Sequence, residues 1–240
     1  MIEDKKLQVS LGEMRYLQAG AAKPDLVYIH GGFGDTGVMS LLEQQFGQKF
    51  RITTPSLPGH GSFNFDEGFS FQDLVATMGE FLSRLNLVDY VLVGHSLGGR
   101  LALEVSRRKE SQAKSVILLA PMLIPLTTGI EQTAANLVHD YASDLGISKR
   151  NKMQFETVLT RLKNLKEIWR LITSVGPVRE NVSGVATTIV WGRNDSVLPI
   201  GQNSSAISKI VGAELKIHAG GHYWPFKPRS MEIIAGLIGE

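Results

Sequence analysis

A serine stands between two glycines in the stretch "VLVGHSLGGRLALEV", residues 91–105. The motif Gly94-His95-Ser96-Leu97-Gly98 follows an apolar run typical of a buried strand and precedes residues with helical spacing. On such a strand-to-helix turn a hydroxyl points out at the amino end of the helix, where developing negative charge is stabilised. Glycines two residues to either side remove side chains that would clash with the turn. The motif predicts that Ser96 is a nucleophile.

A serine nucleophile needs a general base, and the base needs an orienting carboxylate. We expect His222 to be the base, because it follows the last apolar run in the glycine-flanked loop "AGGHYWPF". The other histidines are expected to be structural within a strand (His218), to bond backbone in turns (His30, His60), to lie on the other face of the turn (His95) or to be exposed (His139).

Asp195 is the expected carboxylate, because it follows an apolar run directly in "VWGRNDSVLP". The Asn-Asp pair also forms turns readily, so a structural role is the alternative. Acyl transfer further needs two N–H donors that bind the oxyanion. We expect these from the backbone of Leu97 and of Gly32, the latter in "HGGFGD", and we expect Phe33 to line the acyl pocket.

The elements that position these residues follow from short apolar runs separated by helical patterns. Such alternation predicts an α/β fold with a mostly parallel sheet covered on both faces. A short hairpin is expected around Gly12-Glu13. Strands are expected at 25–30, 51–56, 90–95, 115–120, 187–192 and 213–219, and helices at 38–49, 71–86, 97–109, 200–211 and 229–238.

One connection, residues 122–186, is far too long for an ordinary crossover loop. It carries helical patterns of its own at 130–144 and 151–174. Ligands of open α/β sheets bind beyond the carboxyl ends of the strands, so an insertion here would cover the site. We expect a core domain of residues 1–121 and 187–240, with 122–186 as a helical lid.

Composition excludes several other classes of protein. The formal net charge is +2, without a basic tail or an acidic block that would indicate nucleic acid or a membrane surface. The chain has no cysteine, which excludes disulfides, thiolate metal sites and a cysteine nucleophile. The first ten residues lack a signal-peptide core, and no run of about 18 apolar residues occurs. We expect a cytoplasmic monomer or homodimer without metal.

Five motifs in order, "HGGFGD", "PSLPGHGSF", "GHSLGG", "WGRND" and "GGHYW", resemble those of the α/β-hydrolase family, in its compact, lid-bearing form, along the whole chain. The order Ser, Asp, His also matches that family. The resemblance implies an eight-stranded sheet and hydrolysis of a small carboxylic ester or thioester through an acyl-serine, as in carboxylesterases, with no cofactor. Ser56 replaces the acidic residue that the family usually carries, which affects a turn. A serine nucleophile disfavours dehalogenase and epoxide hydrolase chemistry.

Some features leave the substrate open. Residues 149–170 hold seven Lys or Arg against two Glu, which indicates either a solvated face or a cationic lid that attracts an anionic substrate. Arg100 is expected to lean toward the pocket mouth and Trp169 to contact substrate. "HSLGGR" also resembles the SHCHC synthases, lyases of this fold, although His95 replaces their tyrosine. A carbon–carbon hydrolase or lyase on the same triad, or a non-catalytic ligand-binding protein, are the alternatives.

Overall fold

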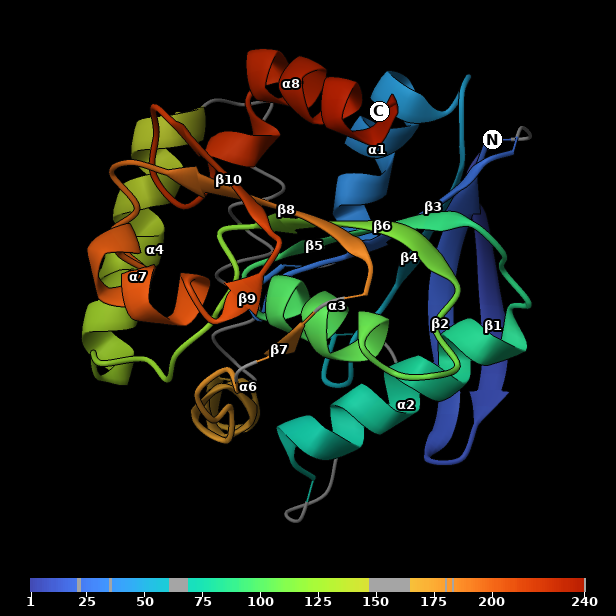
Figure 1. The fold of residues 1–240 in the computed structure, drawn as a ribbon, viewed down its shortest axis with the longest axis horizontal. Coiled ribbons are helices and arrows are strands. Elements are labelled where there is room, and N and C mark those ends of the chain that lie inside the picture. Colours follow the sequence, from blue (N-terminus) through green and yellow to red (C-terminus); the bar gives the residue numbers. More distant parts are fainter. Residues whose placement is uncertain are drawn as a thin grey trace.

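The computed structural model describes residues 1–20, 23–34, 36–60, 69–146, 165–179, 181–182 and 184–239. They form an eight-stranded sheet in the order β1-β2-β4-β3-β5-β6-β8-β10 (Figure 1). Its strands are β1 (Glu3–Val9), β2 (Gly12–Ala19), β3 (Asp25–Ile29), β4 (Arg51–Pro55), β5 (Tyr90–His95), β6 (Ala113–Leu119), β8 (Ala186–Gly192) and β10 (Glu214–His218). Two further strands, β7 (Asn181–Val182) and β9 (Ile210–Val211), pair separately.

The sheet is parallel from β4 to β10. β1 and β2 form an antiparallel hairpin, and β2 pairs antiparallel with β4. All the later pairings are parallel, including β3 with β5 and β8 with β10. The carboxyl ends of β3, β5, β8 and β10 therefore meet at one edge of the sheet. The loops that leave this edge carry the predicted site residues.

Helices cover both faces of this sheet. α1 (Met39–Phe46) and α8 (Pro228–Gly239) pack together on one face, and α2 (Phe71–Arg84) and α3 (Leu97–Ser106) on the other (Figure 1). The other helices in the described ranges are α4 (Ile130–Leu145), α6 (Leu165–Thr173), α7 (Ile200–Ile207), and the short 3-10 helices η1 (Thr36–Val38) and η3 (Trp224–Phe226). α2 begins at a capping box in which the side chains of Ser70 and Asp73 each bond the other's backbone N–H.

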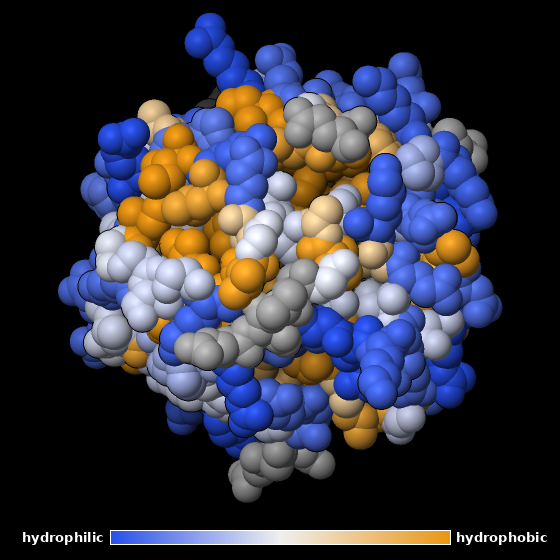
Figure 2. Space-filling view, viewed as in Figure 1, coloured by the Kyte–Doolittle hydropathy of each residue, from blue (hydrophilic) through white to orange (hydrophobic). Residues whose placement is uncertain are grey.

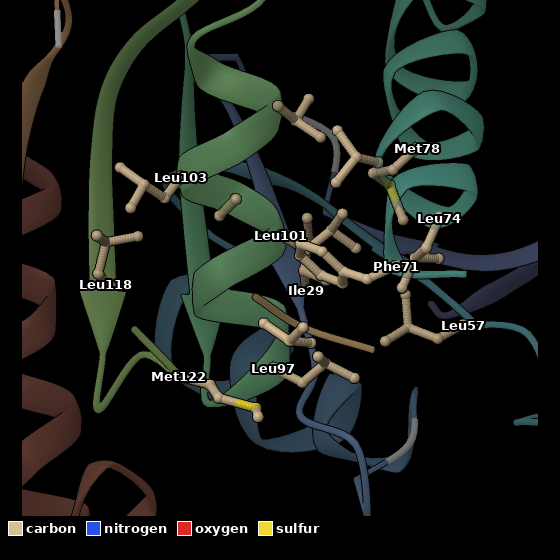
Figure 3. Close-up of a cluster of buried hydrophobic side chains, with 14 of the residues drawn as sticks. Ile29, Leu57, Phe71, Leu74, Met78, Leu97, Leu101, Leu103, Leu118 and Met122 are labelled. Atoms are coloured by element: carbon tan, nitrogen blue, oxygen red, sulfur yellow. The ribbon is translucent and has the colours of Figure 1, made fainter. Parts of the chain in front are cut away.

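The core beneath the turn that carries Ser96 is tightly packed. Leu97 and Leu101 of α3 point toward Phe71 and Leu74 of α2, with Ile29 of β3 beside them (Figure 3). All five side chains are at most 1% exposed. Because burial of each such side chain contributes about 2 kcal/mol, this cluster fixes α3 against the sheet and so fixes the turn before it.

The structure confirms the fold and most of the expected elements. The helix expected at 200–211 is wrong in its last turn, since α7 ends at Ile207 and β9 pairs with β7 instead. Gly212, at φ +81°, turns the chain directly after β9. Of the helix expected at 151–174, the part from Leu165 to Thr173 is present as α6; its earlier part and most of the cationic stretch 149–170 lie outside the described residues.

The surface in view is mainly hydrophilic at its rim, with apolar side chains toward the upper left and the top (Figure 2). Exposed large apolar residues include Leu215 and Ile217 on the edge strand β10. No helix in the described part of the chain is long and apolar enough to cross a membrane.

Candidate active site

Ser96 occupies a strained turn between β5 and α3. Its backbone lies at φ 56° and ψ −119°, a region that residues other than glycine rarely adopt. A Cβ on Gly94 would lie 2.3 Å from the Gly98 carbonyl oxygen, and a Cβ on Gly98 would lie 2.3 Å from the Ile29 carbonyl oxygen. Only glycine fits at either position, which explains the spacing seen in the sequence.

His222 and Asp195 form a buried pair. Nδ1 of His222 lies 2.8 Å from Oδ2 of Asp195, with both side chains at most 2% exposed. Oδ1 of Asp195 accepts hydrogen bonds from the backbone N–H groups of Val197 and Leu198 at 3.0 and 2.7 Å. Burial alone would lower the pKa of His222, but the Asp195 carboxylate raises it above the ordinary histidine value. The pair is arranged to hold an imidazolium.

His95 lies on the same side of the turn as the site, where a position on the other face was expected. This expectation is wrong: His95 lines the cavity with Ser96, and its ring centroid is 4.7 Å from that of His222. Its Nε2 lies 3.0 Å from the backbone carbonyl oxygen of His222. Burial, with the nearby charge of His222, lowers the pKa of His95 to about 3, so His95 is neutral and donates this hydrogen bond.

A cavity of about 90 Å³ opens beside the turn. Ser96, His222, Gly32 and Phe33, which the sequence predicts as nucleophile, base, oxyanion donor and pocket wall, all line it. Its other lining residues are mostly aromatic or aliphatic, from β3, η1, α4 and the segment after β10 that includes η3: Tyr28, Val38, Leu137, Tyr141, Leu145, Tyr223 and Phe226.

Gly32 and Leu97, the expected oxyanion donors, are neighbours in space. A Cβ on Gly32 would lie 3.4 Å from the Leu97 side chain and 3.0 Å from that of Ile172. Leu97 is the first residue of α3, so its N–H is free of the helix's own hydrogen-bond ladder. The N–H of Gly32 lies on the loop after β3, and that of Leu97 lies at the start of α3, directly after Ser96.

Two histidines, His30 and His60, hold the loop of Gly32 in place. Both bond backbone groups, as the sequence predicts. Nε2 of His30 accepts from the N–H of Leu57 at 3.2 Å, so its Nδ1 donates to the Gly31 carbonyl oxygen at 2.8 Å. Nε2 of His60 lies 2.6 Å from the Gly32 carbonyl oxygen. The Gly31 carbonyl belongs to the peptide that carries the Gly32 N–H, so His30 sets the orientation of that donor.

Arg100 does not face the pocket mouth, and this expectation is wrong. It is 3% exposed, and its Nε pairs with Glu104 at 2.8 Å. Its Nη1 donates to the carbonyl oxygens of Leu123 and Gly176 at 3.2 and 2.9 Å. Arg100 lies four residues after Ser96 on α3, and its side chain bonds both Leu123, near the start of the insertion 122–186, and Gly176, near its end. Trp169, on α6, is half-buried and is not among the cavity's lining residues.

Residues that the sequence did not reveal come from α4. Asp140 and Asp144 bond the backbone of the loops that carry Asp195 and His222, and Tyr141 lines the cavity. In the sequence, Asp140 and Asp144 form only an acidic pair at helical spacing, which is also typical of a solvated face. Among the described residues, no cluster of three or more His, Asp or Glu side chains has the arrangement of a metal site.

The chain is similar to proteins of a known family. The model of the alpha/beta hydrolase family matches residues 26–235. The chain belongs to this family. Solved alpha/beta hydrolases share the fold: an esterase from Exiguobacterium antarcticum has a TM-score of 0.81 at 16% identity, over 99% of this chain and 100% of that one. A thermophilic esterase has a TM-score of 0.78 at 18% identity, over 100% of this chain and 98% of that one.

Two curated relatives with more than 30% identity match over shorter stretches. Pimeloyl-[acyl-carrier protein] methyl ester esterase from Nitrosospira multiformis is 32% identical over 118 residues, which are 46% of this hydrolase and 42% of that protein. The 2-succinyl-6-hydroxy-2,4-cyclohexadiene-1-carboxylate synthase from Salmonella agona is 36% identical over 86 residues, 36% of this chain and 33% of that one. Each match therefore spans less than half of the relative's own length.

Proposed function

We propose that this alpha/beta hydrolase is a serine esterase that cleaves a small carboxylic ester or thioester through an acyl-serine. One observation carries the proposal: His222, which is buried and paired with Asp195, lines the same cavity as a serine held at positive φ. The esterases among the relatives and structural neighbours support the same reaction class.

In the acylation half-reaction, the Ser96 hydroxyl attacks the carbonyl carbon of the substrate. His222 takes the hydroxyl proton as the bond forms, and Asp195 stabilises the resulting imidazolium. The carbonyl oxygen becomes an oxyanion, which accepts hydrogen bonds from the N–H groups of Gly32 and Leu97. Each such donor typically contributes a rate factor of about 10² to 10³. Collapse of the tetrahedral intermediate expels the alcohol or thiol, which takes the proton from His222.

Deacylation repeats these steps with water as the nucleophile. His222 removes a proton from water, the hydroxide adds to the acyl carbonyl, and the second tetrahedral intermediate uses the same two N–H donors. When it collapses, the proton returns to Ser96 and the carboxylic acid leaves. No step requires a metal or cofactor.

The cavity favours a small, uncharged acyl group. Its volume of about 90 Å³ leaves room for a short chain, and Phe33, Leu137 and Phe226 provide apolar walls. No described residue that lines it is a lysine or an arginine. Since α4 contributes Leu137 and Tyr141, residues 122–186 act in this proposal as a lid over the core formed by 1–121 and 187–240.

The second candidate is a carbon–carbon bond hydrolase or lyase on the same triad, and the local similarity to the Salmonella agona synthase favours it. In this reaction Ser96 acts as a base rather than as an acyl carrier. Such an enzyme turns over simple esters poorly and accumulates no acyl-enzyme.

A panel of p-nitrophenyl esters and acyl thioesters, from two to about ten acyl carbons, tests the first proposal. We expect the highest kcat/KM for short acyl chains, and Ser96→Ala to lose activity by a factor of about 10⁴ or more. Ser204→Ala, on the exposed side of α7, is the matched control and keeps wild-type rates. Full activity of Ser96→Ala rejects the proposal, and a wild type inactive on every ester favours the second candidate.

A further inference from the structure

Two carboxylates on the lid helix α4, Asp140 and Asp144, face the loops of the triad. Oδ2 of Asp140 accepts from the backbone N–H of His222 at 2.8 Å and from that of Ser196 at 2.9 Å. Its Oδ1 accepts from the Ser196 hydroxyl at 2.7 Å. Ser196 directly follows Asp195, so one lid residue bonds the loop of the base and the loop of the acid.

Asp144, one turn further along α4, bonds the same loop on both sides of His222. Oδ2 of Asp144 accepts from the backbone N–H groups of Gly221 and Tyr223, both at 3.0 Å. Its Oδ1 pairs with the ammonium of Lys227 at 2.8 Å, and its side chain is 2% exposed. Three consecutive N–H groups, of residues 221 to 223, therefore point at the two lid carboxylates.

The Gly220-Gly221 pair makes this approach possible. A Cβ on Gly221 would lie 2.8 Å from the carboxylate of Asp140 and 3.0 Å from that of Asp144. Gly220 has φ +136°, and a Cβ there would lie 3.1 Å from Asp144 and 2.5 Å from Trp224. The glycines before the base are thus explained by the lid helix, in the way that the glycines around Ser96 are explained by the turn.

The described groups that face His222 and its loop have a net negative charge. Besides Asp195, the charges of Asp140 and Asp144 raise the pKa of His222. Burial raises the pKa of Tyr141 and of Tyr223, so both phenols stay neutral near neutral pH. Among the described residues, the charged groups around the base and its loop are the carboxylates of Asp140, Asp144 and Asp195 and the cation Lys227 beside Asp144. The neutral rings are those of His95 and Tyr223, which contact His222, and of Tyr141, which contacts Tyr223.

We propose that Asp140 and Asp144 are positioning residues of the base: they fix both triad loops on helix α4 and stabilise the imidazolium form of His222. This inference rests on the proposed function, in which His222 gains a proton in each transition state. With α4 bonded in this way, the loops of His222 and Asp195 are held in place. If α4 moved away, His222 would lose both the hydrogen bonds that orient its loop and the nearby negative charge.

The first test compares pH profiles of kcat/KM for wild type, Asp140→Asn and Asp144→Asn. Asparagine keeps an oxygen that accepts from the same N–H groups but removes the charge, so the acid limb moves to lower pH. We expect the ratio of kcat/KM at about pH 5.5 to that at about pH 8 to rise about twofold or more over wild type. Lys227→Met removes the cation beside Asp144, so the acid limb moves to higher pH.

Glu131→Gln is the matched control, because Glu131 lies exposed in the first turn of the same helix. It removes the same charge without contact to the triad loops and leaves the profile unchanged. Asp144→Glu retains the charge, so it keeps the acid limb of the wild type even if kcat falls. A purely structural role lowers kcat or stability in the asparagine variants without moving the limb.

A second measurement does not depend on turnover. NMR titration of the His222 imidazole, assigned by the resonance that His222→Gln lacks, reports its protonation directly. We expect its midpoint to move down in Asp144→Asn and to stay in Glu131→Gln. Unchanged midpoints in folded Asp140→Asn and Asp144→Asn overturn the inference, and if Asp140→Asn does not fold, Asp144→Asn decides alone. A shift in an enzyme that turns over no ester supports the inference while the esterase proposal fails.

Discussion

His95 and His222 contact each other through ring and backbone: their centroids lie 4.7 Å apart, and Nε2 of His95 donates to the carbonyl oxygen of His222 at 3.0 Å. Asp140 bonds the N–H of the same residue at 2.8 Å. Both backbone polar groups of His222 are therefore held by buried side chains, one from the turn that carries Ser96 and one from α4.

His95→Phe tests the first of these contacts. Phenylalanine retains the edge-on packing against Phe226 but leaves the buried His222 carbonyl without its donor. We expect kcat to fall about tenfold with little change in KM, and the free energy of unfolding to fall by about 1–3 kcal/mol. His95→Gln places an amide N–H near the position of Nε2 and restores part of the rate. Equal rates in His95→Phe and wild type contradict this role.

The pH profile of kcat/KM reports the pKa of the base in the free enzyme. Asp195, Asp140 and Asp144 raise the pKa of His222 despite its burial, and a base must be neutral to accept a proton. Activity is therefore lost as the pH falls through a midpoint above the ordinary histidine value of 6.5. His95, with a pKa of about 3, contributes no second step in this range. A midpoint clearly below 6.5 contradicts the arrangement of charges described here.

Gly98→Ala tests the close approach at the nucleophile turn. The added Cβ would lie 2.3 Å from the carbonyl oxygens of Ile29 and His30, and neither backbone oxygen can move without disturbing β3 or the oxyanion loop. We expect a loss of about 2–4 kcal/mol in the free energy of unfolding, measured with denaturant. Gly201→Ala on α7, where nothing lies within 4 Å, serves as the control and unfolds like wild type or later. Wild-type stability of Gly98→Ala would be inconsistent with the turn.

Arg100→Met separates a structural from a substrate-binding arginine. Loss of the guanidinium removes the Arg100 donor from the carbonyl oxygen of Gly176 and breaks the ion pair with Glu104. The Leu123 carbonyl oxygen loses one of two donors and keeps the N–H of Val178. We expect a loss of about 2–4 kcal/mol in stability and an unchanged ratio of KM between anionic and neutral esters. A large change in that ratio, with stability intact, would instead assign Arg100 to substrate binding.

Elements that depend on a local sequence pattern were predictable from the sequence. The strand at 90–95 and the start of α3 at Leu97 follow from a short apolar run, two glycines and helical spacing, and the structure has the same bounds. The pairing of Asp195 with His222 followed from their places after successive strands, because carboxyl ends of parallel strands share one edge.

Contacts between distant elements were not predictable in the same way. Asp140 and His222 are 82 positions apart, and an acidic pair on a helix is compatible with a solvated face. Arg100 and His95 were misplaced because sequence spacing gives the direction of a side chain only within its own element. β9 was read as helix, since its apolar residues continue the pattern of α7 and its pairing with β7 is a tertiary contact.

Pre-steady-state hydrolysis of a p-nitrophenyl ester, followed by quench and peptide mass mapping, tests the central claim most directly. The account predicts a burst of p-nitrophenol close to one equivalent per chain and a peptide containing acylated Ser96, with neither in Ser96→Ala. If p-nitrophenol is released linearly without a burst, acylation is the slow step. Peptide mapping is then repeated with an excess of an ester whose acyl group leaves the enzyme slowly, so that an acyl-enzyme can accumulate. An acyl group on another residue, or hydrolysis with no acylated peptide under either condition, would contradict the account.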